Sequence, residues 1–118
     1  MKNIKHIAFM VYPVRDPKAA KRFYGDVLGL TETANWKDQW IEYDIGAGTL
    51  AITNGFPQAK PGAKGAMAAL EVDDLDAVIA QLKTKSVALT GDPWDTPVCR
   101  GASITDPDGN EIMLHQKK

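Results

Sequence analysis

Few side chains in this sequence could carry out nucleophilic or acid–base chemistry: there are two histidines, His6 and His115, and one cysteine, Cys99. Cys99 precedes Arg100, whose positive charge could lower the pKa of the thiol. A cysteine nucleophile also needs a base, and the sequence places none next to Cys99. We therefore interpret Cys99 as an incidental thiol.

A candidate ligand site lies in residues 36–44, where aromatic and acidic residues alternate. In a strand, alternation gives two sets of side chains, one with Trp40, Glu42 and Asp44 and the other with Ile41, Tyr43 and Ile45. The apolar set should pack in the core. Trp40 and Glu42 are then left at a pocket or its rim, where an aromatic ring beside a carboxylate suits a planar or cationic ligand. Alternatively, Trp40 covers the sheet or contacts a second protomer.

Other sequence features are compatible with a pocket but do not define a reaction. Trp94, in the proline-containing segment 92–95, could be a lid over a pocket or an anchor at an interface. The sequence contains no glycine-rich phosphate loop, no Gly-x-Ser-x-Gly motif and no pair of cysteines for zinc. Residues 106–110 form a turn motif, and they lack the downstream glutamate of a calcium-binding loop.

The composition is that of a globular protein with no large excess of positive or negative charge. Among 118 residues, 14 basic side chains stand against 15 acidic ones, which gives a net charge of -1. We therefore expect no binding to nucleic acid or to an acidic membrane surface. A single cysteine excludes an intramolecular disulfide and suits a reducing compartment, and no apolar stretch is long enough for a signal peptide or a spanning helix. These features predict a cytoplasmic protein.

The first half of the chain predicts the order β-α-β-β-β. Residues 4–11 are apolar and β-branched, which favours a buried strand. Asp16 and Pro17 are typical of a helix start, and apolar residues at helical spacing then predict an amphipathic helix over 18–28, ending at Gly29. Three short antiparallel strands should follow, over residues 31–33, 39–45 and 49–53.

The second half repeats this order after a linker rich in proline and glycine, residues 56–65. A strand over 66–72 leads to a cap at Asp73 or Asp74 and to a helical stripe of apolar residues. Three more strands are expected, within residues 87–97 and over 101–105 and 112–115. The chain is therefore predicted to be one α+β domain, 1–118, with a first βαβββ module at about 1–55 and a second at about 66–118. Neither module can bury its helix and sheet alone, so the modules must pack within a chain or between chains.

Three motifs, at residues 6–9, 23–30 and 106–112, resemble the vicinal oxygen chelate superfamily, which includes glyoxalase I, extradiol dioxygenases, fosfomycin resistance enzymes and bleomycin-binding proteins. The resemblance covers the whole chain. It implies that the two βαβββ modules form a curved mixed sheet around a cavity, and it favours a homodimer. One scaffold carries several chemistries, so the resemblance alone does not specify a reaction.

In metal-dependent members of that superfamily, four positions on the cavity face hold a divalent ion. By position, the resemblance places them at His6, Leu50, Met67 and Met113. Only His6 could bind a hard divalent ion, because Leu50 has no donor atom and a thioether prefers soft metals. We therefore expect a degenerate metal site and no cofactor. Met10, Met67 and Met113 would offer an adaptable surface to an apolar ligand, or would simply fill the core.

A displaced metal site is the alternative. Strand alternation places Glu111, Met113 and His115 on one face, so Glu111 and His115 would flank the vacant position. Such a site would use His6, Glu71, Glu111 and His115, with Glu71 or Glu111 as the candidate catalytic base. Without metal partners, His6 would be a buried or half-buried side chain that binds a backbone carbonyl or the ligand, and His115 a partly exposed residue at a strand end.

These observations lead to three hypotheses about function. The first is a metal-free protein that binds a small organic molecule, similar to the bleomycin resistance proteins. The candidate ligand-binding residues are His6, Met10, Trp40, Glu42, Leu50, Met67, Trp94, Met113 and His115. The second is a glyoxalase-like lyase or isomerase, or a dioxygenase, that uses the displaced divalent metal. The third is a structural or regulatory dimer without a ligand.

Overall fold

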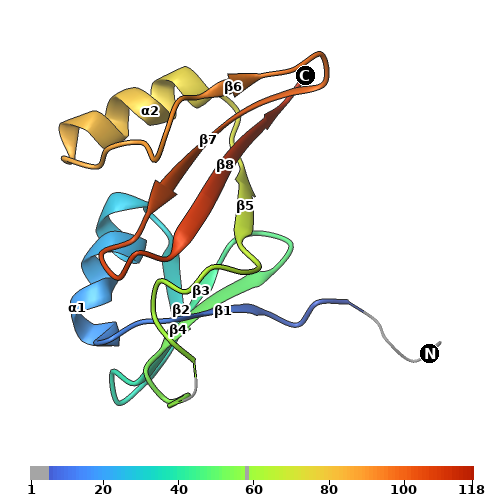
Figure 1. Ribbon diagram of the computed structural model, residues 1–118. Helices are drawn as coiled ribbons and strands as arrows, with labels where there is room; N and C mark the ends of the chain where they lie inside the picture. The colour runs from blue at the N-terminus through green and yellow to red at the C-terminus, as the bar shows by residue number, and fades with distance from the viewer. Residues whose placement is uncertain (1–5, 58) are drawn as a thin grey trace. The chain divides into compact units, whose positions relative to one another are not determined.

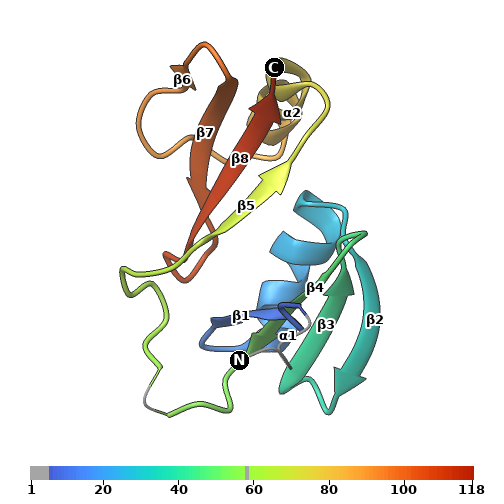
Figure 2. The same ribbon diagram turned by 90° about the vertical axis from the view of Figure 1, so that its right-hand side faces the viewer.

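The chain divides into two compact units, Met1–Pro61 and Gly62–Lys118, which we call module one and module two (Figures 1 and 2). The structure is a computed structural model that describes residues 6–57 and 59–118. Each module contains a four-stranded mixed sheet and a helical segment, in the same βαβββ order. The predicted α+β class and the two modules are confirmed.

Module one consists of β1 (Met10–Pro13), a helical segment, β2 (Thr31–Trp36), β3 (Trp40–Asp44) and β4 (Thr49–Thr53). Its strands lie in the order β1-β4-β3-β2. β1 runs parallel to β4, and the other pairs are antiparallel. The helical segment joins β1 to β2, which also runs parallel to β1, as a crossover connection between parallel strands.

The first strand begins later than its apolar sequence predicts. Residues 4–11 were expected to form it, but residues 4 and 5 lie outside the described part of the chain, and residues 6–9 precede the strand. Pro13 was expected to follow the strand and instead forms its last residue. Proline is tolerated there because β1 is the edge of its sheet, where a missing N–H leaves no ladder bond unmade.

The helical segment of module one starts where the sequence predicts it. Lys18 N donates to Asp16 Oδ1 at 3.1 Å, and α1 covers Pro17–Lys21. The second half is a π-helix, η1 (Arg22–Val27), in which Leu28 N donates to Phe23 O at 2.9 Å. Gly29, at a φ of 70°, ends the helix in the left-handed conformation that glycine tolerates.

Module two consists of β5 (Ala68–Glu71), α2 (Leu75–Thr84), β6 (Trp94–Asp95), β7 (Cys99–Thr105) and β8 (Glu111–Lys117). The strands lie in the order β5-β8-β7-β6, with β5 parallel to β8. Asp74 caps α2 by accepting a hydrogen bond from Ala77 N at 3.1 Å. None of the helices in the described residues has the length and apolar character needed to cross a membrane.

The predicted turn at residues 106–110 joins β7 to β8 and is stabilised by hydrogen bonds among its own residues. The buried Asp106 carboxylate accepts hydrogen bonds from Asp108 N, Asn110 N and Asn110 Nδ2, each at 2.9 Å. Asn110 Oδ1 in turn accepts from Gly62 N at 2.8 Å. The turn therefore also fixes the end of the linker that precedes β5.

Each core lies between the helical segment and one face of the sheet. In module one, Tyr24 of η1 stacks on Tyr43 of β3, with ring centroids 6.1 Å apart. In module two, Leu75 N of α2 donates to Gln116 Oε1 of β8 at 2.8 Å. These contacts identify the helix-covered face of each sheet. We call the opposite face of each sheet its open face.

Candidate functional site

The open face of module one carries an aromatic cluster centred on Trp40. Phe9 and Phe56 both meet the Trp40 ring edge-on, with centroids 5.4 Å and 6.0 Å away. Trp40 Nε1 donates to Glu42 Oε2 at 2.8 Å, which holds the indole in one orientation on this face. Phe9 is 43% exposed and Phe56 is 42% exposed, so the cluster is accessible. We call Phe9, Trp40, Glu42 and Phe56 the aromatic face.

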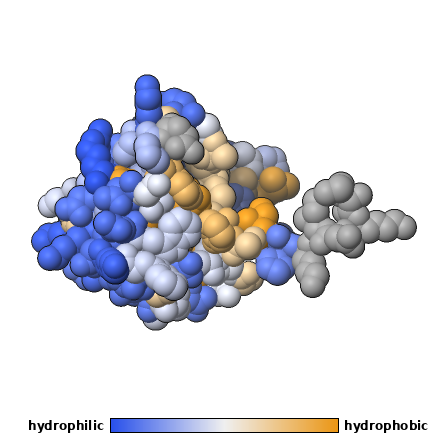
Figure 3. Space-filling view, turned by 90° about the horizontal axis from the view of Figure 1, so that it is seen from below, coloured by the Kyte–Doolittle hydropathy of each residue, from blue (hydrophilic) through white to orange (hydrophobic). Residues whose placement is uncertain are grey.

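The predicted alternation of β3 is confirmed. Ile41 and Tyr43 are buried, whereas Trp40 and Glu42 are half-buried and Asp44 is exposed. Trp36 lies opposite Trp40 across the β2–β3 pair and is 67% exposed, so it extends the aromatic face. Hydrophobic residues gather on one side of the surface seen in Figure 3, and hydrophilic residues cover the other.

The sequence analysis missed Phe9 and Phe56 as partners of Trp40. Phe9 precedes β1, and Phe56 lies in the segment that was interpreted as a linker. No periodicity connects either residue to Trp40, because the contacts arise between segments far apart in the chain. Their one recognisable feature in the sequence is a large apolar side chain outside a predicted helix or strand.

The prediction that Leu50 points toward a pocket is wrong. Leu50 lies opposite Tyr43 across the β3–β4 pair, and residues directly opposite share a face. Leu50 is fully buried on the helix-covered face with Tyr43. Met10 is paired with Leu50 across β1 and β4, so it also lies on this face and not beside Trp40. Ala51, which lies opposite Glu42, occupies the open face instead.

The open face of module two brings together a carboxylate, an imidazole and a thiol. Glu71 lies opposite His115 across β5 and β8, and Glu71 Oε1 is 2.6 Å from His115 Nδ1. Glu71 Oε2 accepts a second hydrogen bond, from Lys117 N at 2.7 Å. Cys99 of β7 lies on the same face as His115, next to it across the β7–β8 pair. We call Glu71, His115 and Cys99 the thiol cluster.

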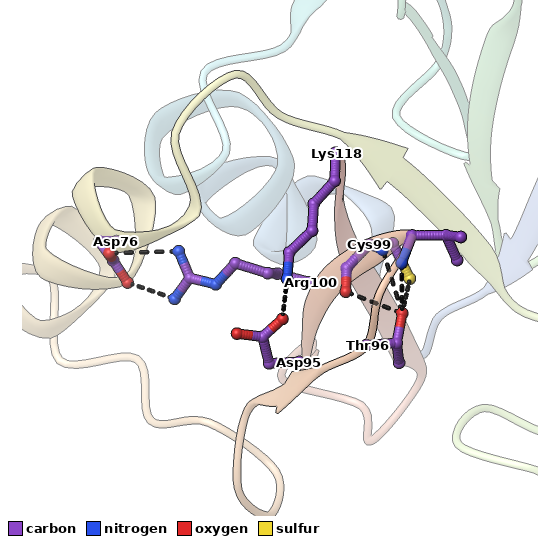
Figure 4. Close-up of polar contacts among 7 residues, drawn as sticks. Asp76, Asp95, Thr96, Cys99, Arg100 and Lys118 are labelled. Atoms are coloured by element: carbon purple, nitrogen blue, oxygen red, sulfur yellow. Dashed lines mark hydrogen bonds and ion pairs between the residues drawn. The ribbon is translucent and has the colours of Figure 1, made fainter.

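The sequence places no base next to Cys99 along the chain, whereas the strand register brings His115 to its side of the sheet. Cys99 is opposite Lys117 in the β7–β8 pair, which places it diagonally across from His115 on the same face. Arg100, expected to act on the thiol, points to the other face, where it forms two hydrogen bonds with Asp76 at 2.8 Å and 3.2 Å (Figure 4). Sequence distance alone could not show the pairing, because 16 positions separate Cys99 from His115.

The remaining neighbours of Cys99 come from β6 and the segment after it. Thr96 Oγ1 lies 3.4 Å from Cys99 Sγ (Figure 4). Trp94 is half-buried and lies over Gly101, where an ideal Cβ would come within 2.1 Å of the indole. Trp94 therefore lies on the sheet of module two, and its predicted role as a lid or an interface anchor stays a prediction.

The electrostatics of the thiol cluster follow from these hydrogen bonds. Hydrogen bonding with Thr96, and then with His115 and Trp94, lowers the pKa of Cys99. Hydrogen bonding to Glu71 and then to Cys99 raises the pKa of His115. Hydrogen bonds from His115 and from the backbone of Lys117 lower the pKa of Glu71. All three shifts favour the charged forms, which are a thiolate, an imidazolium and a carboxylate.

The remaining predicted site residues occupy separate positions. Glu111, Met113 and His115 share the open face of β8, as alternation predicts, whereas Ile112 and Leu114 are buried on the other face. Met67 precedes β5 and is 36% exposed. His6 precedes β1 and is exposed, so the expected burial of this residue is wrong.

Two of the residues at the metal positions that the resemblance implies do not suit a divalent ion. Leu50 has no donor atom and is buried on the helix-covered face. Met113 would offer only a thioether, which hard divalent ions do not favour. Across residues 6–57 and 59–118, no three histidine, cysteine, aspartate or glutamate side chains converge in a way that could hold a metal ion. Within module two, Glu71, Glu111 and His115 accordingly do not gather as a set of metal ligands.

A separate groove in module one lies on the helix side. Its volume is about 430 Å³, and it is lined by Lys18, Lys21, Arg22, Gly25, Asp26, Leu30, Glu32 and Tyr43. Lys21 Nζ is 3.5 Å from Glu32 Oε1, so part of this charge is already paired. Burial, with the negative charges of Glu32 and Asp26, raises the pKa of Tyr43 to about 12. The predicted pocket residues do not line this groove.

Comparisons with known proteins agree with the fold and the two modules. An antibiotic-binding protein, TnmS3 from Streptomyces sp. CB03234, is 32% identical, with a TM-score of 0.86 over 98% of both chains. A glyoxalase/bleomycin resistance protein from the same organism is 34% identical, with a TM-score of 0.80 over 94% of this chain and 100% of the other.

A lactoylglutathione lyase from Agrobacterium tumefaciens is 20% identical, with a TM-score of 0.77 over 97% of this chain and 95% of the other. Similarity at that level shows a shared fold alone. Residues 3–114 match the family model described as the Glyoxalase/Bleomycin resistance protein/Dioxygenase superfamily. The chain therefore belongs to the Glyoxalase/Bleomycin resistance protein/Dioxygenase superfamily.

Proposed function

We propose that this protein binds a small, planar organic molecule on the aromatic face of module one, without a divalent metal. The observation that carries the proposal is the fixed, accessible indole of Trp40, which is bound to Glu42 and flanked by Phe9 and Phe56. An aromatic ring held in one orientation can stack on a flat ligand with little loss of side-chain entropy.

The carboxylate of Glu42 defines the polar part of this proposal. One of its oxygens, Oε2, accepts the hydrogen bond from Trp40, and the residue is half-buried. Its negative charge would favour a ligand that carries a cationic or donor group next to its ring system. The 32% identity to an antibiotic-binding protein supports a small-molecule ligand.

The side chains at the positions where related enzymes bind a metal support ligand binding without a metal. A lyase or dioxygenase of the metal-dependent type needs three or four convergent ligands. Leucine and methionine occupy the corresponding positions in this chain. We also propose that the protein is a cytoplasmic homodimer, which is supported by its single cysteine and its family membership.

The test is a thermal-shift screen of planar aromatic compounds, antibiotics included, with EDTA or with Mg²⁺, Mn²⁺, Ni²⁺ or Zn²⁺. A compound that binds the native state raises the melting temperature as its concentration exceeds its Kd. For each binder, calorimetry should then show at least a tenfold weaker Kd for Trp40→Ala and an unchanged Kd for Val98→Ala. Val98 is 71% exposed and lies in module two, so it controls for the loss of an exposed apolar side chain.

Two outcomes would overturn the proposal. One is a ligand whose binding is the same in Trp40→Ala as in the unaltered protein. The other is a stoichiometric divalent ion in protein purified without chelator, lost in His6→Ala and required for ligand binding. Light scattering at several concentrations tests the homodimer separately.

A further inference from the structure

The thiol cluster of module two has the composition of an activated nucleophile. Its three members come from three adjacent strands, with Glu71 on β5, His115 on β8 and Cys99 on β7. Glu71 Oε1 is 2.6 Å from His115 Nδ1, so the other ring nitrogen, Nε2, is available to the sulfur of Cys99. A thiol, an imidazole and a carboxylate that orients the imidazole are the three parts of a cysteine nucleophile with its base.

The surroundings of the sulfur support a negative charge on it. The Trp94 ring lies over Gly101, two residues from Cys99 on the same face of β7, and its indole N–H can only donate. Thr96 Oγ1 lies 3.4 Å from the sulfur of Cys99. The pKa of Cys99 is lowered by these contacts and by His115, in agreement with this geometry. Cys99 and His115 are both half-buried, so a small molecule can reach them from the open face.

We propose that Cys99 is a nucleophile that adds to small conjugated carbonyl compounds, with His115 as the proton donor and Glu71 as its positioning residue. The thiolate sulfur forms a bond to the β-carbon of the C=C–C=O unit, and the π electrons move to the carbonyl oxygen as an enolate. His115 delivers its proton to the α-carbon as the carbonyl re-forms. The sum is addition of S–H across the double bond, with no leaving group and no change in net oxidation state.

Addition fits this site better than acyl transfer does. An acyl-transfer site needs backbone N–H groups aimed at a developing oxyanion. Here Cys99 N and Val98 N both donate to Thr96 Oγ1, at 3.0 Å and 3.2 Å. Thr96 N donates to Cys99 O at 2.8 Å. These three N–H groups already have acceptors, whereas the flat indole of Trp94 offers a surface for a conjugated ligand.

The experiment uses the full chain with N-ethylmaleimide and 2-cyclohexen-1-one as probes, and intact-mass spectrometry as the readout. Because Cys99 is the single cysteine, an adduct of one probe molecule reports this site alone. At pH 6.5 we expect N-ethylmaleimide to react at least fivefold faster with Cys99 than with glutathione. 2-Cyclohexen-1-one should give an adduct and cyclohexanone none.

Variants separate the roles of the three residues. His115→Gln should slow addition at least fivefold and move the pH–rate midpoint upward, toward the value of an ordinary thiol, about 8.5. Glu71→Gln should shift the midpoint in the same direction by a smaller amount. Cys99→Ser should give no adduct. Ser103→Ala is the matched control, since Ser103 shares the open face of β7 but is not part of the cluster, and its rate should equal that of the unaltered protein.

The proposal is overturned if Cys99 reacts at the rate of glutathione with the same pH–rate midpoint. It is equally overturned if His115→Gln, shown to be folded by circular dichroism, leaves both rate and midpoint unchanged. Trp94→Phe offers a further readout: it keeps an aromatic surface but removes the indole N–H, so the midpoint should rise. The proposal is independent of ligand binding on the aromatic face, because Trp40→Ala should leave the addition rate unchanged.

Discussion

Glu71 and His115 face each other across the parallel pair β5–β8, with Glu71 Oε1 2.6 Å from His115 Nδ1. The same carboxylate binds Lys117 N, so the strand pair fixes both of its oxygens. This arrangement fixes the imidazole on the face of the sheet that also carries Cys99.

The Glu71–His115 pair should stabilise the fold most strongly within a limited range of pH. The raised pKa of His115 adds stability that is complete below the unfolded value of about 6.5 and is lost as the pH rises through the folded value. The lowered pKa of Glu71 adds stability that is complete above its unfolded value of about 4.3 and is lost as the pH falls through the folded value. The melting-temperature difference between the unaltered protein and Glu71→Gln should therefore be largest between about pH 4.3 and 6.5.

Histidine NMR gives a direct check of this pair. The signal of His115 should titrate above the ordinary value, and Glu71→Gln should bring it down. Glu111→Gln removes a carboxylate from the same face of β8 and should leave the His115 titration in place. A His115 titration that is the same in all three proteins would contradict the prediction.

Gly101→Ala should destabilise module two. A methyl group at this position would lie 2.1 Å from the Trp94 ring, so the indole must leave its place beside Cys99. Overpacking of this kind costs roughly 1–3 kcal/mol, which denaturant unfolding can measure. Gly65→Ala is the control, because nothing lies within 4 Å of an added Cβ there. Equal stability of the two variants would show that Trp94 does not cover Gly101.

Asp74→Ala should lower the free energy of unfolding by about 0.5–2 kcal/mol, because the Ala77 N–H at the start of α2 loses its acceptor. The neighbouring Asp73 is exposed, and Asp74 is the residue that caps the helix. Asp73→Ala should therefore change stability by less than about 0.5 kcal/mol. A larger loss of stability in Asp73→Ala than in Asp74→Ala would show that Asp73, and not Asp74, caps the helix.

Tyr43→Phe should stabilise module one or leave it unchanged. The Tyr43 hydroxyl is buried and has no hydrogen-bond partner among the described residues, and an unsatisfied buried polar group costs about 1–3 kcal/mol. The ring itself stacks on Tyr24, so Tyr43→Ala should cost about 3–5 kcal/mol.

The same hydroxyl predicts a loss of stability in alkali. Its pKa is raised to about 12, so the unfolded chain loses this proton first as the pH rises above about 10. Tyr43→Phe should lack this part of the decline between pH 10 and 12. If Tyr43→Phe is less stable than the unaltered protein at pH 7, the hydroxyl has a partner in solution.

The sequence by itself determined the repeated βαβββ order, the helix starts at Asp16 and at Asp73 or Asp74, and the two faces of β3 and β8. These features are local, since a cap or an alternation of two residues is complete within one segment of chain. The family followed from motifs at fixed places in the same order.

Only the tertiary structure decided which face of β4 is open and what lies beside Cys99. β4 is buried on both faces, so its sequence shows no alternation from which to orient Leu50, and the pairing with β3 sets its direction instead. Likewise, the contacts of Phe9 and Phe56 with Trp40, and of His115 with Cys99, join separate segments. Strand register and chain crossings create such contacts, and neither is encoded in the spacing of residues within one segment.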